Sequence, residues 1–257
     1  MGGAMHRLLV DTRELSQESP ALSRDALHHL KVLRPQHGEL VELFDGRGGL
    51  RRYAYDAAAR ALATVPGEPL RRVPPAEGSL TLFACVTKGS RWDWTVEKAT
   101  ELGVTRIVPV ISARTIVRIP ASERAAKRER WRRIAEDAAR QSDAAWLPEI
   151  DAATDFAATL PLVKGMRCFV GALTDPPPPP LLAALAAPSR DGAASRDLAL
   201  YVGPEGDFTP EELASLVAIA TPVSFGPTVL RAETAAIFGV SVLAAARACE
   251  QPAKHGI

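Results

Sequence analysis

Two short loops rich in glycine and proline, each directly after an apolar run, constrain the fold of this chain most strongly. The first, residues 202–209, reads VGPEGDFT and follows the apolar run 198–202. The second, residues 225–235, reads FGPTVLRAETA, follows the run 223–225 and leads into an apolar helix over 233–249. Strand, glycine turn and helix in succession are typical of α/β proteins, whose ligands collect outside the carboxyl ends of parallel strands. We therefore expect a ligand site between the two loops.

The first loop is suited to binding a ligand through main-chain amides. Gly203 and Gly206 lack the side chain that would hold a ligand away from the backbone, and Pro204 stiffens the turn between them. Thr209, Pro210 and the two glutamates that follow predict a helix start with a capping box. A tight turn without a ligand is the alternative for this loop taken alone. The paired second loop favours the binding site.

The two loops, in this order and at this spacing, resemble the SPOUT class of knotted methyltransferases, specifically the family that methylates N3 of a uridine in 16S ribosomal RNA. Further segments extend the resemblance over nearly the whole chain: KGSRWDW at 88–94, EKATELGV at 97–104, LKVLR at 30–34 and LFDG at 43–46. The chain departs from the family pattern where Asp207 replaces a usual glycine, Thr228 a common arginine and Ala232 a frequent threonine. RQSDA at 140–144 also stands where EQSGR is usual.

The resemblance implies an α/β methyltransferase domain with a mostly parallel sheet and a deep trefoil knot, preceded by a small PUA-like β-barrel domain that binds RNA. The linker-like sequence RRVPPAEG at 71–78 marks the boundary. This gives an RNA-binding domain over residues 5–72 and a methyltransferase domain over residues 78–257.

Hydrophobic periodicity predicts the elements of both domains. In the first, we expect strands at 6–10, 39–44, 49–55 and 61–65 and a helix at 23–32. In the second, we expect strands at 80–87, 106–111, 168–172, 198–202 and 223–225, with helices at 92–102, 122–144 and 233–249. The proline run 176–180 and the small-residue segment 187–196 are predicted to be surface loops.

The resemblance also implies S-adenosylmethionine as the cofactor, held mainly by backbone groups of the two loops. The expected cofactor-binding residues are Leu173, Val202, Gly203, Pro204, Glu205, Gly206, Phe225, Gly226, Pro227, Leu230, Arg231, Ala232, Thr234 and Ala235.

For catalysis we expect Arg231 to stabilise the negative charge that develops on the uracil oxygens. Arginine is permanently charged, and its planar donor fork suits carbonyl oxygens. Glu205 and Glu233 are the candidate proton acceptors. In the alternative interpretation, Arg231 pairs with one of these glutamates and only braces the loops, and Glu233 only caps its helix.

The net charge of +1, from 31 basic and 30 acidic residues, indicates no partner by itself. Residues 124–140 carry seven Lys and Arg, which would follow RNA phosphates or, alternatively, form a solvated helix face with pairs such as Glu129 with Arg133. The expected RNA contacts are Arg7, Lys31, Arg34, Lys88, Arg91, Arg114 and Arg140. The partners implied by the resemblance are 16S ribosomal RNA, within an assembled or nearly assembled small subunit, and a second copy of the chain in a homodimer.

The positions of the histidines, cysteines and apolar runs argue against histidine-based catalytic or metal sites, reactive cysteines and a membrane location. None of the five histidines lies between residues 38 and 254, which excludes a Ser-His-Asp triad or a histidine-ligated metal there, and we expect no metal. Cys85, Cys168 and Cys249 lie far apart in apolar runs, so we expect small buried side chains. No apolar run approaches the ~18 to 20 residues of a membrane span, so we expect a cytoplasmic protein.

Two other functions stay open. A non-catalytic RNA-binding or ribosome-assembly protein on the same fold would fit the departures at Asp207 and Ala144. A nucleotide-dependent oxidoreductase would use the sequence DGRGG at 45–49. That motif requires a helix after the glycines, whereas the alternating LRRYAY that follows predicts a returning strand and a hairpin turn.

Overall fold

The structure, a computed structural model, describes residues 5–188 and 195–250, and its contacts divide the chain into two units. The first unit contains the residues up to Pro75 together with Ala139–Leu147, and the second contains Ala76–Ala138 and the residues from Pro148 onward. Most of the predicted loop 187–196 lies outside the described residues.

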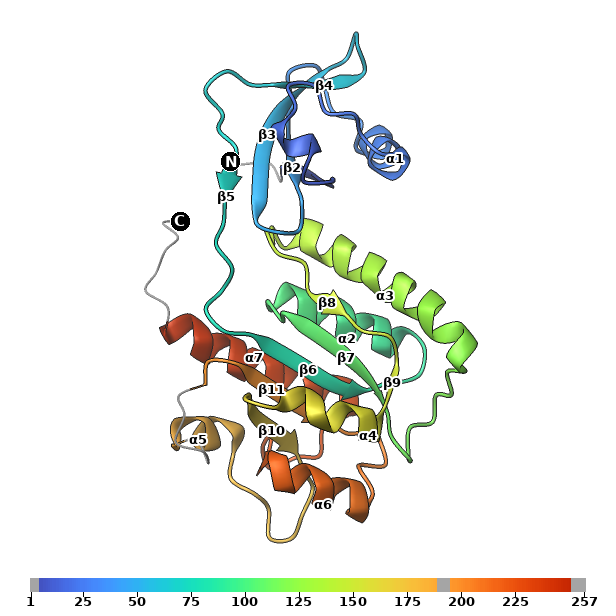
Figure 1. Cartoon of the computed structure of the whole chain (residues 1–257), viewed down its shortest axis with the longest axis vertical. Coiled ribbons are helices and arrows are strands. Elements are labelled where there is room, and N and C mark those ends of the chain that lie inside the picture. Colours follow the sequence, from blue (N-terminus) through green and yellow to red (C-terminus); the bar gives the residue numbers. More distant parts are fainter. Residues whose placement is uncertain (1–4, 189–194, 251–257) are drawn as a thin grey trace. The chain divides into compact units, whose positions relative to one another are not determined.

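The first unit is built on a small mixed sheet (Figure 1). Its strands are β1 (His6–Leu9), β2 (Leu40–Phe44), β3 (Gly49–Asp56), β4 (Ala61–Thr64) and β5 (Arg71–Arg72). β1 runs parallel to β2, whereas β3 pairs antiparallel with β2, β4 and β5. A 3₁₀ turn (Glu14–Ser16) and α1 (Arg24–Leu33) complete the unit, and the Ser23 side chain caps α1 by accepting from the Ala26 amide. The buried core includes Leu8, Leu15, Leu30, Val41 and Tyr53.

The glycine-rich sequence 45–49 forms the hairpin turn between β2 and β3. Gly46 and Gly48 adopt φ values of 65° and 87°, which glycine tolerates without strain. The buried Asp45 carboxylate closes the turn, because its Oδ1 accepts from the amides of Arg47 and Gly49 at 2.8 Å. A strand follows the glycines, so the geometry of a nucleotide-binding loop is absent and the oxidoreductase hypothesis is wrong.

Arg7 holds the segment Ala139–Leu147 on the first unit. Its buried guanidinium donates to the carbonyl oxygens of Ala139 at 2.9 Å and Ala144 at 3.2 Å, and to Glu42 at 3.1 Å. It also lies over the Phe44 ring at 4.4 Å. The side chain of Arg7 is 2% exposed, so the expected RNA contact of this residue is wrong. The positive charge of Arg7 is paired with the Glu42 carboxylate inside the first unit.

The second unit contains a seven-stranded parallel sheet. Its order is β12 (Thr221–Val223), β10 (Arg167–Gly171), β11 (Leu198–Val202), β6 (Leu80–Cys85), β7 (Arg106–Ile111) and β8 (Glu149–Ile150), with β9 (Thr154–Asp155) also on β7. Every pairing is parallel, as the alternation of strands and helices in the sequence predicts.

Helices cover both faces of this sheet (Figure 1). On one face pack α2 (Ser90–Glu101), α3 (Ala121–Gln141), α5 (Leu181–Ala186) and α7 (Ala232–Glu250). On the other pack α4 (Phe156–Thr159), the 3₁₀ turn Leu160–Val163 and α6 (Pro210–Ile219). Phe83 and Tyr201 stack at 4.4 Å on that second face. The central strands are therefore buried on both sides, which explains their continuous apolar sequences.

Two expectations about apolar residues need correction. Cys85 and Cys168 are buried, and burial raises the pKa of their thiols to about 11 and about 12, but Cys249 is exposed. The expectation that no apolar run approaches the length of a membrane span is also wrong. The segment Ala232–Cys249 of α7 has a mean hydropathy of 1.4, and by length and composition it is long and apolar enough to cross a membrane. Because α7 packs against α2, β6 and β11, its apolar side chains are explained by the core of the second unit.

Candidate functional site

The ends of three neighbouring strands define the candidate site. β10 lies between β12 and β11, and all three run in the same direction, so Gly171, Val202 and Val223 end at one edge of the sheet. The loops that leave these strands enclose a pocket. Its lining residues are Gly171, Ala172, Leu173, Val202, Gly203, Pro204, Glu205, Asp207, Val223, Ser224, Phe225, Gly226, Thr228, Val229, Leu230, Ala232 and Ala235. This is the crevice that the two loops predict.

Two glycines keep the pocket open. A Cβ atom added to Gly203 would lie 3.0 Å from Oδ1 of Asp207 and 3.3 Å from the Phe208 ring. Gly226 has φ of 130°, where side chains are strained, and nothing lies within 4 Å of its added Cβ position. Gly203 therefore permits a close turn, and Gly226 leaves open space that a ligand can fill.

The first loop is braced from outside the pocket. Arg114 Nη1 donates to the carbonyl oxygens of Gly206 at 2.8 Å and Phe208 at 3.3 Å. The capping box at the start of α6 forms as predicted: the Thr209 hydroxyl accepts from the amide of Glu212, and the Glu212 carboxylate accepts from the amide of Thr209. The loop thus has a fixed shape before any ligand binds. Arg114 supports that shape, which competes with its expected role in RNA binding.

The second loop is anchored by the Phe225 ring. An added Cβ on Gly171 would lie 2.4 Å from this ring, and one on Gly239 would lie 3.2 Å from it. The ring also meets Phe238 edge-on at 5.9 Å between centroids. Gly171 and Gly239 are therefore needed for packing, a role that the sequence does not reveal because their partner lies on a distant segment.

Arg91 connects the two carboxylates that we consider for catalysis. Its guanidinium lies 3.5 Å from Glu205 Oε1 and 3.9 Å from Glu233 Oε1. Glu233 is buried, and its Oε2 has no hydrogen-bond partner in the described part of the chain. Arg231 is exposed and forms no ion pair with any described residue. The predicted brace between Arg231 and these glutamates is therefore wrong, because Arg91 occupies that position.

Comparison with known proteins assigns the chain to a family. A family model described as an RNA methyltransferase domain matches residues 74–244. The ribosomal RNA small subunit methyltransferase E of Synechocystis is 31% identical over 240 residues, which cover 90% of this chain and 74% of that protein. This chain belongs to the ribosomal RNA small subunit methyltransferase E family. The resemblance noted in the sequence is thereby confirmed at the level of the family.

Two solved structures similar to this family member contain a cofactor. The ribosomal RNA small subunit methyltransferase E of Neisseria gonorrhoeae, bound to S-adenosylmethionine, is 25% identical with a TM-score of 0.76. A methyltransferase of Legionella pneumophila, also in complex with S-adenosylmethionine, is 27% identical with a TM-score of 0.75. Each match covers 94% of this chain and 98% of the other chain. The α/β fold is therefore shared along almost the whole length of these two proteins.

The pocket of this methyltransferase E family member contains most of the residues expected to bind the cofactor. Those that line it are Leu173, Val202, Gly203, Pro204, Glu205, Phe225, Gly226, Leu230, Ala232 and Ala235. Gly206, Pro227, Arg231 and Thr234 belong to the same loops but are not among the lining residues. Asp207 and Thr228 also line the pocket, although neither was among the residues expected to bind the cofactor.

The basic residues of α3 are held mainly by acidic neighbours. The ion pairs join Arg124 to Asp155, Arg130 to Asp93, Arg132 to Glu129 and Glu136, and Arg133 to Glu129. Arg128 donates to the Ile150 carbonyl oxygen at 2.7 Å. Of the two interpretations of this helix, the one with ion pairs on a solvated face is supported. Lys31, Lys88 and Arg34 are exposed, and Arg34 stands at the C-cap of α1.

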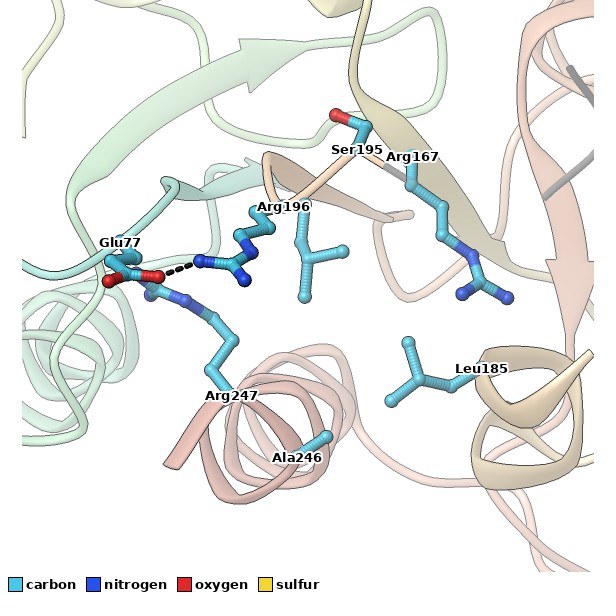
Figure 2. Close-up of a pocket in the computed structure, with 8 residues that line it drawn as sticks. Glu77, Arg167, Leu185, Ser195, Arg196, Ala246 and Arg247 are labelled. Atoms are coloured by element: carbon cyan, nitrogen blue, oxygen red, sulfur yellow. Dashed lines mark ion pairs between the residues drawn. The ribbon is translucent and has the colours of Figure 1, made fainter. Parts of the chain in front are cut away.

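A second hollow lies at the opposite, amino-terminal ends of β10 and β11 (Figure 2). It is lined by Glu77, Arg167, Leu185, Ser195, Arg196, Leu198, Ala246 and Arg247. Arg196 pairs with Glu77, and Arg167 and Arg247 donate to main-chain carbonyl oxygens at 2.7 Å. The contacts of these three arginines join neighbouring segments of the second unit. Because the arginines already have partners within the protein, we assign no ligand to this hollow.

Proposed function

We propose that this protein transfers a methyl group from S-adenosylmethionine to N3 of a uridine in 16S ribosomal RNA. The observation that carries the proposal is the pocket at the ends of β10, β11 and β12, in a chain of the ribosomal RNA small subunit methyltransferase E family. Two relatives of this fold hold the same cofactor.

The lining of the pocket fits this cofactor. At Gly203 and Gly226 the pocket is lined by backbone atoms, because glycine has no side chain. Leu173, Phe225 and Leu230 provide apolar surface that an adenine ring can contact. Glu205 and Asp207 supply negative charge, which suits a ligand that carries a sulfonium and an ammonium group. When bound, the cofactor supplies an activated methyl group, so the protein needs only to position the base and to remove its N3 proton.

Glu205 is the better placed of the two candidate proton acceptors. It lines the pocket, whereas Glu233 is buried at the first turn of α7 and does not belong to the lining. We assign Glu205 to accepting the N3 proton, and Glu233 to holding Arg91, which in turn orients Glu205. Arg231, which pairs with no described carboxylate, is free to stabilise the negative charge that spreads onto the uracil oxygens.

The function is tested by mapping methylated nucleosides in 16S ribosomal RNA from a strain that lacks the gene. We expect one N3-methyluridine to disappear and to return when purified protein and S-adenosylmethionine are added to the isolated small subunits. Unchanged nucleosides would reject the proposal. A missing methyl group on a ribose or on another base would keep the enzyme class and reject the uridine N3 assignment.

Replacing Arg231 with alanine is expected to lower kcat by about 100-fold, the scale of one lost oxyanion donor. The cofactor dissociation constant should change little, because Arg231 does not line the pocket. Single-turnover methylation and calorimetry measure the two quantities. Arg133→Ala on α3, which removes an exposed arginine elsewhere, is the matched control. If Arg231→Ala instead weakens cofactor binding while the bound complex turns over normally, the catalytic role of Arg231 is rejected. Arg231 would then be a residue that supports cofactor binding.

We further propose that the chain forms the deep trefoil knot of its class and that residues 5–72 form a PUA-like barrel that binds RNA. The small mixed sheet of the first unit supports the RNA-binding domain, with Lys31 on its surface. The methyltransferase domain would then span residues 78–257, and the protein would act in the cytoplasm on the assembled or nearly assembled small subunit.

We propose that the protein works as a homodimer. Leu173, Val229 and Phe238 are large apolar side chains that remain 65%, 76% and 42% exposed around the pocket and on α7. Burial of such side chains against a second copy would complete the site at a two-fold interface. Light scattering at micromolar concentration is expected to give twice the monomer mass, and Phe238→Glu should convert the dimer to monomer. A monomeric wild-type protein would refute this proposal.

The alternative function, a non-catalytic RNA-binding or assembly protein, makes a different prediction. Such a protein has no need to keep an open cofactor pocket, and its calorimetric titration with S-adenosylmethionine should give no heat of binding. The open space beside Gly226 and the fixed shape of the first loop favour the enzyme.

A further inference from the structure

We infer that Asp207 makes the pocket select the positively charged form of the cofactor over the neutral thioether that remains after methyl transfer. The inference rests on the proposed function and names a residue that determines specificity. During transfer the bond between sulfur and the methyl carbon breaks, and its electron pair stays on sulfur. The sulfonium therefore loses its positive charge while the rest of the molecule is unchanged.

The charges around the pocket are the first observation. Among its described lining residues, Glu205 and Asp207 are the ionisable side chains, and no lysine, arginine or histidine is present. A unit charge near a carboxylate in a partly enclosed site interacts far more strongly than in water. The pocket thus favours a cation, and methyl transfer removes one.

The second observation separates the two carboxylates. Glu205 lies 3.5 Å from the guanidinium of Arg91, so part of its charge is already balanced. Asp207 has no ion pair with a described residue, and its Oδ1 accepts from the amide of Phe208 at 2.8 Å. No hydrogen bond to its Oδ2 is found in the described part of the chain. Asp207 is therefore the carboxylate whose charge is available to a ligand.

The backbone gives a third, independent observation. Asp207 has φ of 59°, the left-handed conformation that glycine adopts readily and that aspartate tolerates better than most residues. The missing side chain of Gly203 makes room for the carboxylate, because an added Cβ would lie 3.0 Å from Asp207 Oδ1. The loop thus keeps a glycine-like shape and adds one negative charge to the pocket.

The inference predicts a ratio of affinities. Removing the charge of Asp207 should weaken binding of S-adenosylmethionine by about tenfold, with little change for S-adenosylhomocysteine, its thioether product. Sinefungin, in which a protonated amine replaces the sulfonium, should behave like S-adenosylmethionine. The preference of the wild-type protein for the two cationic ligands should shrink as the salt concentration rises.

The experiment is calorimetric titration of the full-length protein with these three ligands. Asp207→Asn removes the charge and keeps the shape of the side chain. Asp207→Gly removes the whole side chain at a position whose backbone conformation glycine adopts readily. Glu149→Gln removes an exposed carboxylate on β8 and is the matched control. The Asn and Gly variants should both lose the preference for the cations, and Glu149→Gln should keep it. Equal losses for all three ligands would overturn the inference, because Asp207 would then contact a group that they share. An unchanged ratio in the Asn variant would overturn it as well.

The same titrations separate this inference from the proposed function. If the wild-type protein binds none of the three ligands, the proposed function fails and the inference fails with it. If the wild-type protein binds S-adenosylmethionine and its product equally well, the function stands and only the role of Asp207 is rejected.

Discussion

A valine at position 203 is expected to abolish cofactor binding, with a loss of affinity of at least about 100-fold. The added Cβ would already lie 3.0 Å from Asp207 Oδ1 and 3.3 Å from the Phe208 ring, and the two methyl groups reach further. Overpacking of this kind costs about 1 to 3 kcal/mol, and the displaced loop would also move away from the ligand. Calorimetry with S-adenosylmethionine measures the effect.

Valine at position 226 is expected to have a similar effect for a different reason. Nothing lies within 4 Å of the added Cβ, so the side chain would project into open space in the pocket, and φ of 130° is strained for a branched residue. Gly165→Val is the matched control, since Gly165 also has positive φ and open surroundings but lies outside this pocket. Unchanged affinity in both pocket variants would reject the site assignment.

The second large effect is expected from Arg7→Ala, which should lower the free energy of unfolding by about 3 kcal/mol. The substitution leaves the carbonyl oxygens of Ala139 and Ala144 without their buried donor and removes one cation from Glu42. Arg71 still pairs with Glu42 at 2.6 Å, which keeps the loss at the lower end of the range for broken buried pairs. Urea denaturation followed by circular dichroism measures the change.

The control for this variant is Arg13→Ala, since Arg13 is exposed and precedes the 3₁₀ turn of the first unit. We expect Arg13→Ala to change the unfolding free energy by less than about 0.5 kcal/mol. A similarly small effect of Arg7→Ala would contradict the structural role of Arg7 and would return this residue to the set of candidate RNA contacts.

The sequence predicts the elements well because their signals are local. The run at 198–202, the turn glycines and the capping box at Thr209 each depend on residues a few positions apart, and each forms as expected. The hairpin at 45–49 is also recognised correctly, because the alternating sequence after the glycines indicates a strand. Such short-range patterns determine secondary structure and, in parallel sheets, the edge at which loops gather.

Contacts between distant segments account for what the sequence interpretation missed. Arg7 is buried against carbonyl groups more than 130 positions away, and nothing near it in the sequence distinguishes it from a surface arginine. Arg91 takes the place expected for Arg231, because α2 carries it to Glu205 and Glu233. The role of Gly171 depends in the same way on the ring of Phe225. The roles of these residues can be recognised only in the folded structure, where their partners from distant segments lie beside them.

The ion pairs along α3 affect how strongly salt should weaken RNA binding. Each phosphate that a free cation neutralises releases about 0.7 to 0.9 of a counterion, which sets the slope of log affinity against log salt. Arg124, Arg130, Arg132 and Arg133 already face carboxylates, so any RNA they met would displace an internal partner and release few ions. Four paired arginines at about 0.7 to 0.9 of a counterion each correspond to about three counterions. The slope of log affinity against log salt should therefore be smaller in magnitude by about three than the slope expected if every arginine on α3 were unpaired. If the protein binds RNA as proposed, the affinity should therefore fall less steeply with salt than that of a protein whose arginines are all unpaired.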